Sequence, residues 1–298
     1  MKLAQLSAKD KGLFDEFLNL NIHELSVYSF PNIYIWKGLF DIRWAIIKNS
    51  LCVFFRDKMG CFLYLAPLAE KTTVDIIEKA FVIMDSQNSN REVSRVENIE
   101  KKDLSFYLKS GYECKKKSCD YICSRTDLVL LEGDKFKAKR ASYNYFVKHS
   151  EFEYLPFSLS YNDECLGLYE LWMLQRRTKS SDYLYRGMLD DNFDCLRIML
   201  DDYRVLGLTG RVVKIGGEIK AFTFGFRLNK DAFCILYEIT DLSIKGLAQF
   251  IFRRFCSELK DYRQINIMDD SGLENLKKVK LSYRPIKLVP AYIATRKD

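Results

Sequence analysis

Hydrophobic residues in the first half of the chain recur at two spacings, which predict helices and strands in alternation. Spacings of three and four, as at positions 13, 14, 17 and 18, give a helix one apolar face. Shorter apolar runs bounded by turn residues such as Asn49-Ser50 predict strands. The expected elements are a helix around 13–18, strands at Ile42–Lys48, Leu51–Arg56 and Cys61–Leu65, a helix at Thr73–Met84, a strand at Glu92–Val96, a helix at Lys101–Lys109 and a strand from Tyr112 to Cys123.

The second half repeats this order of elements. Gly216-Gly217 predicts a tight hairpin, and Gly246 opens a helical pattern. The elements expected there are strands at Arg211–Ile215, Ile219–Leu228 and Phe233–Ile239, a helix at Gly246–Leu259, a strand at Gln264–Met268, a helix at Leu273–Val279 and a strand at Ile286–Ala294. Between the halves we expect helices at Asp134–Lys148, Asn162–Arg177 and Phe193–Tyr203 and a strand at Phe152–Leu155. The shared order predicts an α/β protein with mixed sheets and two similar domains, residues 1–126 and 127–298.

The composition fits this two-domain interpretation. The 298 residues are 48% hydrophobic and 29% charged, as in an ordinary globular protein. The longest apolar run, Cys61 to Ala69, is far shorter than the roughly 18–20 residues that span a bilayer. The N-terminus has no apolar signal-peptide core. We therefore expect a cytoplasmic protein.

The nine cysteines and two histidines limit the chemistry of the chain. Cys114, Cys119 and Cys123 lie closest together, but their spacing is not that of a zinc knuckle. Neither His23 nor His149 lies in a catalytic motif. We expect buried thiols, no metal site, and catalysis by carboxylates, lysine, tyrosine and backbone amides.

The order of elements in each half is similar to that of the Gcn5-related N-acyltransferase fold. In that fold a glycine-rich turn opens the central helix, and its backbone amides receive the pyrophosphate of acyl-CoA. The matching turn contains Lys245, Gly246 and Ala248, but Ser243 stands in the position of the usual Arg or Gln. A glycine at a helix start also serves close packing, so the sequence leaves both roles open.

Four segments carry a more specific resemblance. They are Ser29–Trp36, Asp127–Arg140, Ile215–Gly225 and Asn266–Pro285, which are similar to S-F-x-N-L-x-x-W, D-L-x-x-L-x-G-K-K-F-x-x-K-R, G-K-I-V-A-F-T-x-G and N-R-E-x-D-x-G-x-x-x-L-R-K-A-K-x-S-Y-x-P. On these segments the chain resembles soluble bacterial proteins related to the C-terminal domain of phosphatidylglycerol lysyltransferase. Those proteins are in turn similar to tandem acyltransferase-fold proteins of the Fem type. The chain departs from the pattern at Ile267 and Met268, where the family usually has Arg and Glu.

The resemblance implies acyl transfer, with an aminoacyl group moving from aminoacyl-tRNA to a lipid or amine acceptor. It implies no permanently bound cofactor, and the co-substrate is aminoacyl-tRNA or, as the alternative, acyl-CoA. The implied partners are tRNA and an anionic lipid headgroup rather than DNA, with a peripheral position at the inner membrane face. A third alternative, supported by the net charge of +7, is a non-catalytic protein that binds RNA or an anionic membrane.

Four residues are candidates for the catalytic steps. Glu238 ends one predicted strand and Asp269 and Asp270 end another, so each carboxylate is a candidate base for an attacking amine. Tyr283 keeps the family pattern and is the candidate acid for the leaving group. The structural alternatives are a solvated charge for Glu238, helix capping for Asp270, and a core ring with a paired hydroxyl for Tyr283.

The candidate substrate-binding residues are mostly cations. Lys139 and Arg140 lie on a basic predicted helix, and Lys280 lies in a second basic stretch. Such side chains are suited to contact phosphates of a tRNA or of a lipid headgroup. Lys245, Gly246 and Ala248 complete the set through the turn described above. The structural alternative for each cation is a solvated helix surface.

Overall fold

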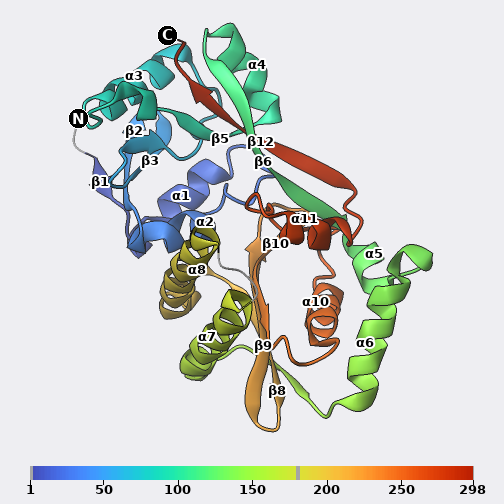
Figure 1. The fold of residues 1–298 in the computed structure, drawn as a ribbon. Helices are drawn as coiled ribbons and strands as arrows, with labels where there is room; N and C mark the ends of the chain where they lie inside the picture. The colour runs from blue at the N-terminus through green and yellow to red at the C-terminus, as the bar shows by residue number, and fades with distance from the viewer. Residues whose placement is uncertain (1–2, 179–181, 298) are drawn as a thin grey trace. The chain divides into compact units, whose positions relative to one another are not determined.

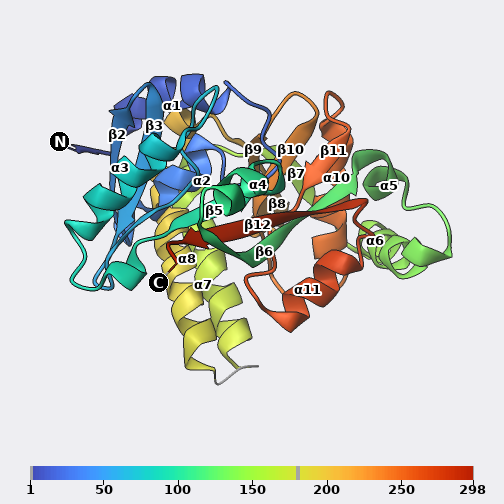
Figure 2. The same ribbon diagram turned by 90° about the horizontal axis from the view of Figure 1, so that it is seen from above.

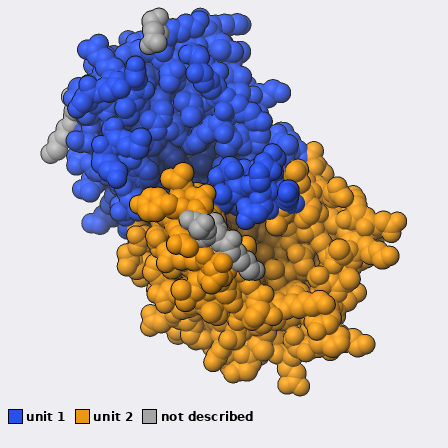
Figure 3. Space-filling model, viewed as in Figure 1, with its two compact units in different colours: residues 1–121, 268–278, 287–298 blue, residues 122–267, 279–286 orange. Residues whose placement is uncertain are grey.

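The computed structural model describes residues 3–178 and 182–297, and the chain forms two compact units (Figure 3). Unit 1 comprises residues 1–121, 268–278 and 287–298. Unit 2 comprises residues 122–267 and 279–286. Each unit therefore takes segments from both halves of the chain. No helix in the described part of the chain is long and apolar enough to cross a membrane.

Unit 1 is built around a mixed sheet in the order β1-β2-β3-β4-β5-β12. In this sheet β4 and β5 are parallel, and the other neighbouring strands are antiparallel. Its elements are β1 (Ala4–Gln5), α1 (Lys11–Leu18), α2 (Phe30–Tyr34), β2 (Asp41–Ile47), β3 (Ser50–Arg56), β4 (Cys61–Leu63), α3 (Val74–Asp85), β5 (Val96–Glu100), α4 (Lys101–Lys109), the first part of β6 (Glu113–Ser124), most of α11 (Glu274–Leu281) and β12 (Lys287–Thr295).

The strands of unit 2 also form mixed sheet, in the order β6-β11-β10-β9-β8-β7. Only β10 and β11 are parallel in this sheet. The elements are the end of β6, α5 (Arg125–Leu130), α6 (Lys137–His149), β7 (Glu153–Pro156), α7 (Asn162–Arg177), α8 (Tyr183–Asp201), α9 (Tyr203–Leu206), β8 (Thr209–Ile215), β9 (Glu218–Arg227), β10 (Ala232–Thr240), α10 (Leu247–Glu258) and β11 (Gln264–Asn266).

Helices cover both faces of the unit 2 sheet. Helices α7 and α8 lie on one face, and α10 with α6 lies on the other (Figures 1 and 2). The apolar stripe of α10, including Phe250 and Ile251, packs on Phe146 of α6 and on Val213 of β8. This packing fixes α6 beside α10 and β10, the three elements that position the candidate site.

Most sequence predictions of elements are confirmed, some to the residue. Helices α4 and α7 have the predicted bounds, and Gly216-Gly217 forms the β8–β9 turn with both φ angles positive. The strand predicted at Glu92–Val96 is wrong, because that stretch forms a short 3-10 helix and β5 begins at Val96. The predicted pattern also missed α5 and the first ten residues of α8.

The last strand of each half is exchanged. Strand β12 ends the second half of the sequence but pairs with β5 in unit 1, whereas the end of β6 pairs with β11 in unit 2. Element order alone does not distinguish this pairing from a simple tandem repeat. The compact units divide the chain within β6, between residues 121 and 122. The domain boundary predicted between residues 126 and 127 stays a prediction.

Candidate active site in unit 2

Glu238 lies on the part of β10 that still pairs with β9 on one side but no longer pairs with β11 on the other. Strand β10 pairs with β11 from Ala232 to Cys234 and with β9 as far as Thr240. A β-bulge separates Ile235 from Tyr237 in the β9 pairing. Bulges re-aim the side chains that follow them and are common beside active sites. Glu238 lies directly after this bulge, beyond the residues that pair with β11.

The carboxyl group of Glu238 is poorly solvated. The residue is partly exposed as a whole, but its Oε2 atom is buried and has no hydrogen-bond partner in the described part of the chain. Burial raises the pKa of Glu238 from 4.5 to about 8, and the positive charge of Lys139 opposes this rise. A carboxyl with this pKa exchanges protons near neutral pH, as a general base or acid requires.

Lys139 reaches the same place from α6. Its Nζ atom lies 3.3 Å from the centroid of the Tyr283 ring, as in a cation–π contact. Burial lowers the pKa of Lys139 from 10.5 to about 8, and the negative charge of Glu238 opposes this fall. The sequence placed Lys139, Glu238 and Tyr283 in three separate segments, and the fold brings them together.

Tyr283 is held from several sides. Only 6% of its surface is exposed, and its ring centroid lies 4.4 Å from that of Phe252 on α10. The Gln249 side chain donates a hydrogen bond from Nε2 to the Tyr283 hydroxyl oxygen at 3.1 Å. Burial, with the charge of Glu238 as the next cause, raises the pKa of Tyr283 well above its usual value. The phenol therefore keeps its proton over the physiological pH range.

Sequence analysis missed Gln249 as a functional residue. Gln249 is a polar residue of the helix predicted at 246–259, yet it is partly buried and bonded to Tyr283. A signal was present, since Gln249 precedes Phe252 by three residues and so shares the face that packs on Tyr283. Its partner is 34 residues away, which helical spacing does not reveal.

Lys280 also belongs to unit 2, but its contact is with the backbone. Its Nζ atom donates a hydrogen bond to the carbonyl oxygen of Ile267, a buried residue at the position where the family usually has Arg. This contact ties the last turn of α11 to the residue that follows β11. The predicted role of Lys280 in phosphate binding stays a prediction.

The other predicted binding residues of unit 2 make contacts outside the cluster of Lys139, Glu238 and Tyr283. Arg140 donates to the backbone carbonyls of Leu131 and Gly133, and so supports the turn before α6. The Lys245 Nζ atom lies 4.3 Å from the centroid of the Tyr145 ring. Both contacts are structural, and binding roles for these cations stay predictions.

The glycine turn before α10 has a packing explanation. Gly246 has a φ of +85°, and a Cβ atom there would lie 2.2 Å from the carbonyl oxygen of Ser142 on α6. Only glycine lets the two backbones approach this closely. Ala248, in the first turn of α10, is partly buried. The packing role that the sequence left open for Gly246 is therefore sufficient to explain the residue.

Asp269 and Asp270 belong to unit 1, where they shape a turn. The Asp269 carboxylate accepts the amide of Ser271 at 3.3 Å, and the Asp270 carboxylate accepts the amide of Gly272 at 3.0 Å. The Tyr121 hydroxyl donates to the other oxygen of Asp270. These contacts stabilise the turn that precedes α11, and the catalytic and capping roles of the two residues stay predictions.

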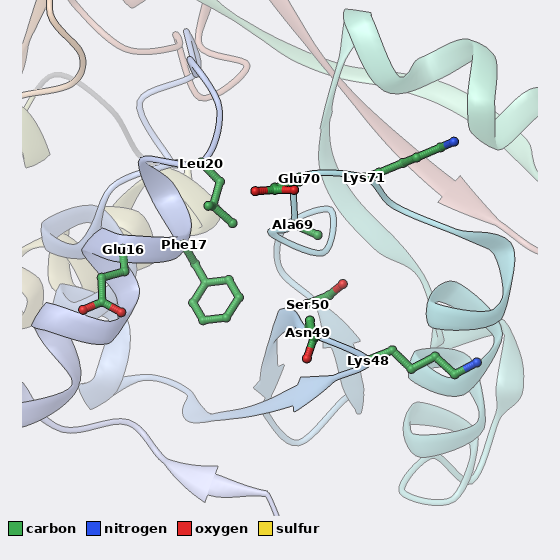
Figure 4. Close-up of a pocket in the computed structure, with 9 residues that line it drawn as sticks. All are labelled: Glu16, Phe17, Leu20, Lys48, Asn49, Ser50, Ala69, Glu70 and Lys71. Carbon is green, nitrogen blue, oxygen red and sulfur yellow. The ribbon is translucent and has the colours of Figure 1, made fainter.

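Unit 1 also contains an open hollow of about 540 Å³. Figure 4 shows that its walls come from α1 and the turn after it, from the β2–β3 turn and from the loop before α3. The lining residues are Glu16, Phe17, Leu20, Lys48, Asn49, Ser50, Ala69, Glu70 and Lys71. None of the ten predicted site residues is among them. In residues 3–178 and 182–297, no group of three or more His, Cys, Asp or Glu side chains is arranged to hold a metal ion.

Comparison with protein families matches residues 21–295 to the family of the phosphatidylglycerol lysyltransferase C-terminal domain. The chain belongs to this family. The match covers most of the chain, including every predicted site residue, and it confirms the resemblance found in the sequence. No curated protein sequence matches the chain.

Solved structures of related fold agree with this assignment. A conserved protein of unknown function from Bacteroides thetaiotaomicron has 26% identity and a TM-score of 0.89, with 100% of both chains covered. L-PGS from Bacillus licheniformis has 18% identity and a TM-score of 0.66, over 97% of this chain and 92% of that one. FemX has 9% identity and a TM-score of 0.64, over 98% and 97%. The predicted α/β class with two tandem acyltransferase-like folds is confirmed.

Proposed function

We propose that this protein is an acyltransferase that moves an aminoacyl group from aminoacyl-tRNA to an amine or hydroxyl group of a lipid or amine acceptor. The observation that carries the proposal is the cluster of Lys139, Glu238 and Tyr283 in unit 2, in a chain of the lysyltransferase C-terminal family. The cluster joins a group able to accept a proton, a group able to donate one, and a cation.

Glu238 is the proposed base. An acceptor amine or hydroxyl must lose a proton as it attacks the ester carbonyl of the donor, and a carboxylate with a pKa of about 8 is well matched to that step. The unpartnered Oε2 atom supports this assignment, since a carboxylate committed to a structural role would have hydrogen-bond donors around it.

Tyr283 is the proposed acid. When the ester breaks, the leaving hydroxyl of the donor needs a proton, and the phenol of Tyr283 is protonated at neutral pH. Gln249 donates to the hydroxyl oxygen from Nε2 at 3.1 Å and accepts the Tyr283 O–H at Oε1 at 3.4 Å, so the O–H bond would turn from this long contact to the donor. Lys139 lies over the ring and supplies positive charge to the carbonyl oxygen as negative charge develops on it.

The acyl-CoA alternative has less support. Its basis in the sequence was the turn at Gly246, and the contact of that glycine with Ser142 explains the residue without a ligand. Acyl-CoA therefore enters the test as a competing donor. The third alternative, a binder without activity, enters as the outcome in which no donor gives product.

The test is a transfer assay with radiolabelled aminoacyl-tRNAs, offered one amino acid at a time, and with acetyl-CoA in parallel. The acceptors are phosphatidylglycerol vesicles and a soluble amine. We expect product from an aminoacyl-tRNA, and a loss of about 10²–10⁴-fold in rate for Glu238→Gln and for Tyr283→Phe.

Lys137→Met is the matched control, because Lys137 is an exposed residue of the same helix as Lys139. It should keep the parent rate. Product from acetyl-CoA alone would replace the aminoacyl proposal with the acyl-CoA alternative. The absence of product from every donor, with tRNA binding retained in both site variants, would favour the non-catalytic binder.

A further inference from the structure

Lys139 differs from nearby lysines because no carboxylate or carbonyl group holds its charge. Its Nζ atom lies 3.3 Å from the centroid of the Tyr283 ring, and no described residue forms an ion pair or a hydrogen bond with it. Lys135, four residues earlier, pairs with an aspartate, and Lys280 donates to a backbone carbonyl. The Lys139 ammonium therefore depends on the ring and on water, although the residue is only partly exposed.

Three groups of unit 2 face the end of this side chain, and only one of them favours its positive charge. Glu238 on β10 does so when it is ionised. The Cys123 thiol on β6 and the Tyr283 phenol are neutral, because burial raises the pKa of Cys123 to about 12 and that of Tyr283 well above its usual value. Burial outweighs Glu238 and lowers the pKa of Lys139 from 10.5 to about 8.

These surroundings make Lys139 a nucleophile near neutral pH. At pH 7.5 about a quarter of the Lys139 side chains carry a neutral amine, against about one in a thousand for an ordinary lysine. The N–H bonds of that amine keep to the electron-rich face of the Tyr283 ring, so the lone pair is directed away from the ring. Desolvated lysines of this kind attack carbonyl carbon atoms.

We propose that Lys139 is a site of covalent acylation, at which its amine takes the acyl group of a small acyl phosphate. The Nζ atom attacks the carbonyl carbon, a C–N bond forms, and the C–O bond to the phosphate breaks. The phosphate takes the proton that the nitrogen loses and leaves as hydrogen phosphate. The product is an uncharged amide. This modification goes beyond the proposed transfer reaction and uses no step of it.

Acylation of Lys139 would also switch off the candidate site. The amide has no positive charge to offer to a developing oxyanion, and the added acyl group occupies space beside Tyr283 and Glu238. Acyl phosphates would thereby lower the activity of the protein. This consequence rests on the proposed function, whereas the modification itself is measured without it.

Two lysines of unit 2 are internal controls in the same molecule. Lys137 lies on the same helix and is exposed. Lys245 is also exposed, and its Nζ atom lies 4.3 Å from the centroid of the Tyr145 ring. Lys245 therefore has an aromatic contact without burial. If the ring alone made a lysine reactive, Lys245 would react as fast as Lys139.

The test measures the rate of acetylation at each lysine. The full chain is treated with acetyl phosphate at pH 7.5, the remaining amines are capped with deuterated acetic anhydride after unfolding, and tandem mass spectrometry of the peptides gives the two labels at each site. We expect Lys139 to react about tenfold faster than Lys137 and Lys245, because a weaker base is also a weaker nucleophile and part of the gain from its larger neutral fraction is lost.

The same measurement in urea shows whether the fold causes the preference. In the unfolded chain the three lysines should react at rates within about threefold of one another. Equal rates at Lys139, Lys137 and Lys245 in the native protein would overturn the proposal. So would a preference for Lys139 that persists in urea, because it would come from the local sequence.

Variants separate this proposal from the proposed function. Tyr283→Phe keeps the ring and Glu238→Gln removes only a charge that favours the ammonium, so both should keep the acetylation of Lys139 although both should lose transfer. Tyr283→Ala opens the site to water and should lower the rate at Lys139 to that at Lys137, with thermal unfolding as the check that the variant is folded. Preferential acetylation of a parent protein that transfers nothing would contradict the proposed function alone. Transfer by a parent protein without that preference would overturn the acylation site alone.

Discussion

Two glutamates, one in each unit, show how different surroundings give the same side chain opposite properties. Glu100 is the last residue of β5 in unit 1 and accepts hydrogen bonds from the His23 Nδ1 atom and the Glu24 amide, both at 2.8 Å. Lys102 adds an ion pair at 2.8 Å. Glu238 on β10 in unit 2 has a buried Oε2 atom without a hydrogen-bond partner among the described residues.

The pKa values of the two groups differ accordingly. Burial acts on Glu100 to raise its pKa, but hydrogen bonds from His23, Lys102 and Glu24 outweigh burial and lower the pKa to about 2. For Glu238 burial dominates and the pKa rises to about 8. Burial alone therefore does not mark a catalytic carboxylate. A buried carboxylate that accepts few hydrogen bonds is a better candidate, because it binds and releases its proton near neutral pH.

The largest expected effect on stability follows from Glu100. Glu100→Ala leaves the buried His23 ring and the Glu24 amide without their acceptor, so we expect the free energy of unfolding to fall by about 3–5 kcal/mol. Glu238→Ala removes a carboxylate whose Oε2 atom has no hydrogen-bond partner among the described residues, and should leave stability at neutral pH unchanged or raise it. Chemical denaturation followed by circular dichroism measures both. Equal losses from the two variants would contradict the comparison.

The pH dependence of stability gives the next largest effect. The native pKa of Glu238 is raised from 4.5 to about 8, so the native state binds a proton more tightly than the unfolded state and stability falls as pH rises across that range. The native pKa of Lys139 is lowered from 10.5 to about 8, so stability rises as pH increases from about 8 to 10.5. Together, Glu238 and Lys139 should therefore give their contribution to the free energy of unfolding a minimum near pH 8, on the order of a few kcal/mol deep.

Difference curves between parent and variants isolate this contribution from the other titrating groups. Glu238→Gln should remove the falling limb, and Lys139→Met should remove the rising limb. Glu100 acts at another pH: its lowered pKa gives stability that is complete above about 4.5 and is lost as pH falls toward 2. If the falling and rising parts of the stability curve are unchanged in Glu238→Gln and Lys139→Met, the side chains of Glu238 and Lys139 are solvated in solution.

The sequence predicted the local elements well and the contacts between distant segments poorly. Helices α4 and α7 follow directly from apolar spacing, and Glu238 was a candidate because it ends a strand. Strand β5 was misplaced because Glu97, Asn98 and Glu100 make it look like a loop, although all three are buried and paired. Polar residues in a buried strand follow no simple periodicity when their partners lie elsewhere in the chain.

The candidate site shows the same limit. Lys139 and Tyr283 were each candidates on a family pattern, but no spacing in the sequence predicts that the Lys139 ammonium lies over the Tyr283 ring. That contact needs α6 to pack on α10, which depends on Gly246 and on the fit of Phe146 to Phe250. The exchange of β6 and β12 between the units is equally invisible, since it depends on which strand edges meet after the chain has folded.

The smallest expected effect comes from Gln249, and it tests the contrast between the two units at a single hydrogen bond. Glu100 is fixed by several donors, whereas Tyr283 depends on one side chain for its hydroxyl contact, the Nε2 atom of Gln249 at 3.1 Å. Gln249→Leu should cost about 1 kcal/mol of stability and, if the proposed reaction holds, about tenfold in kcat with little change in KM, because the phenol loses its orientation rather than its chemistry. Ser257→Ala, on the same helix with its hydroxyl bonded to the Arg254 carbonyl, is the matched control and should keep the parent kcat. A rise in KM with kcat unchanged would instead make Gln249 a substrate contact, and Tyr283 would then need another group to hold it in place.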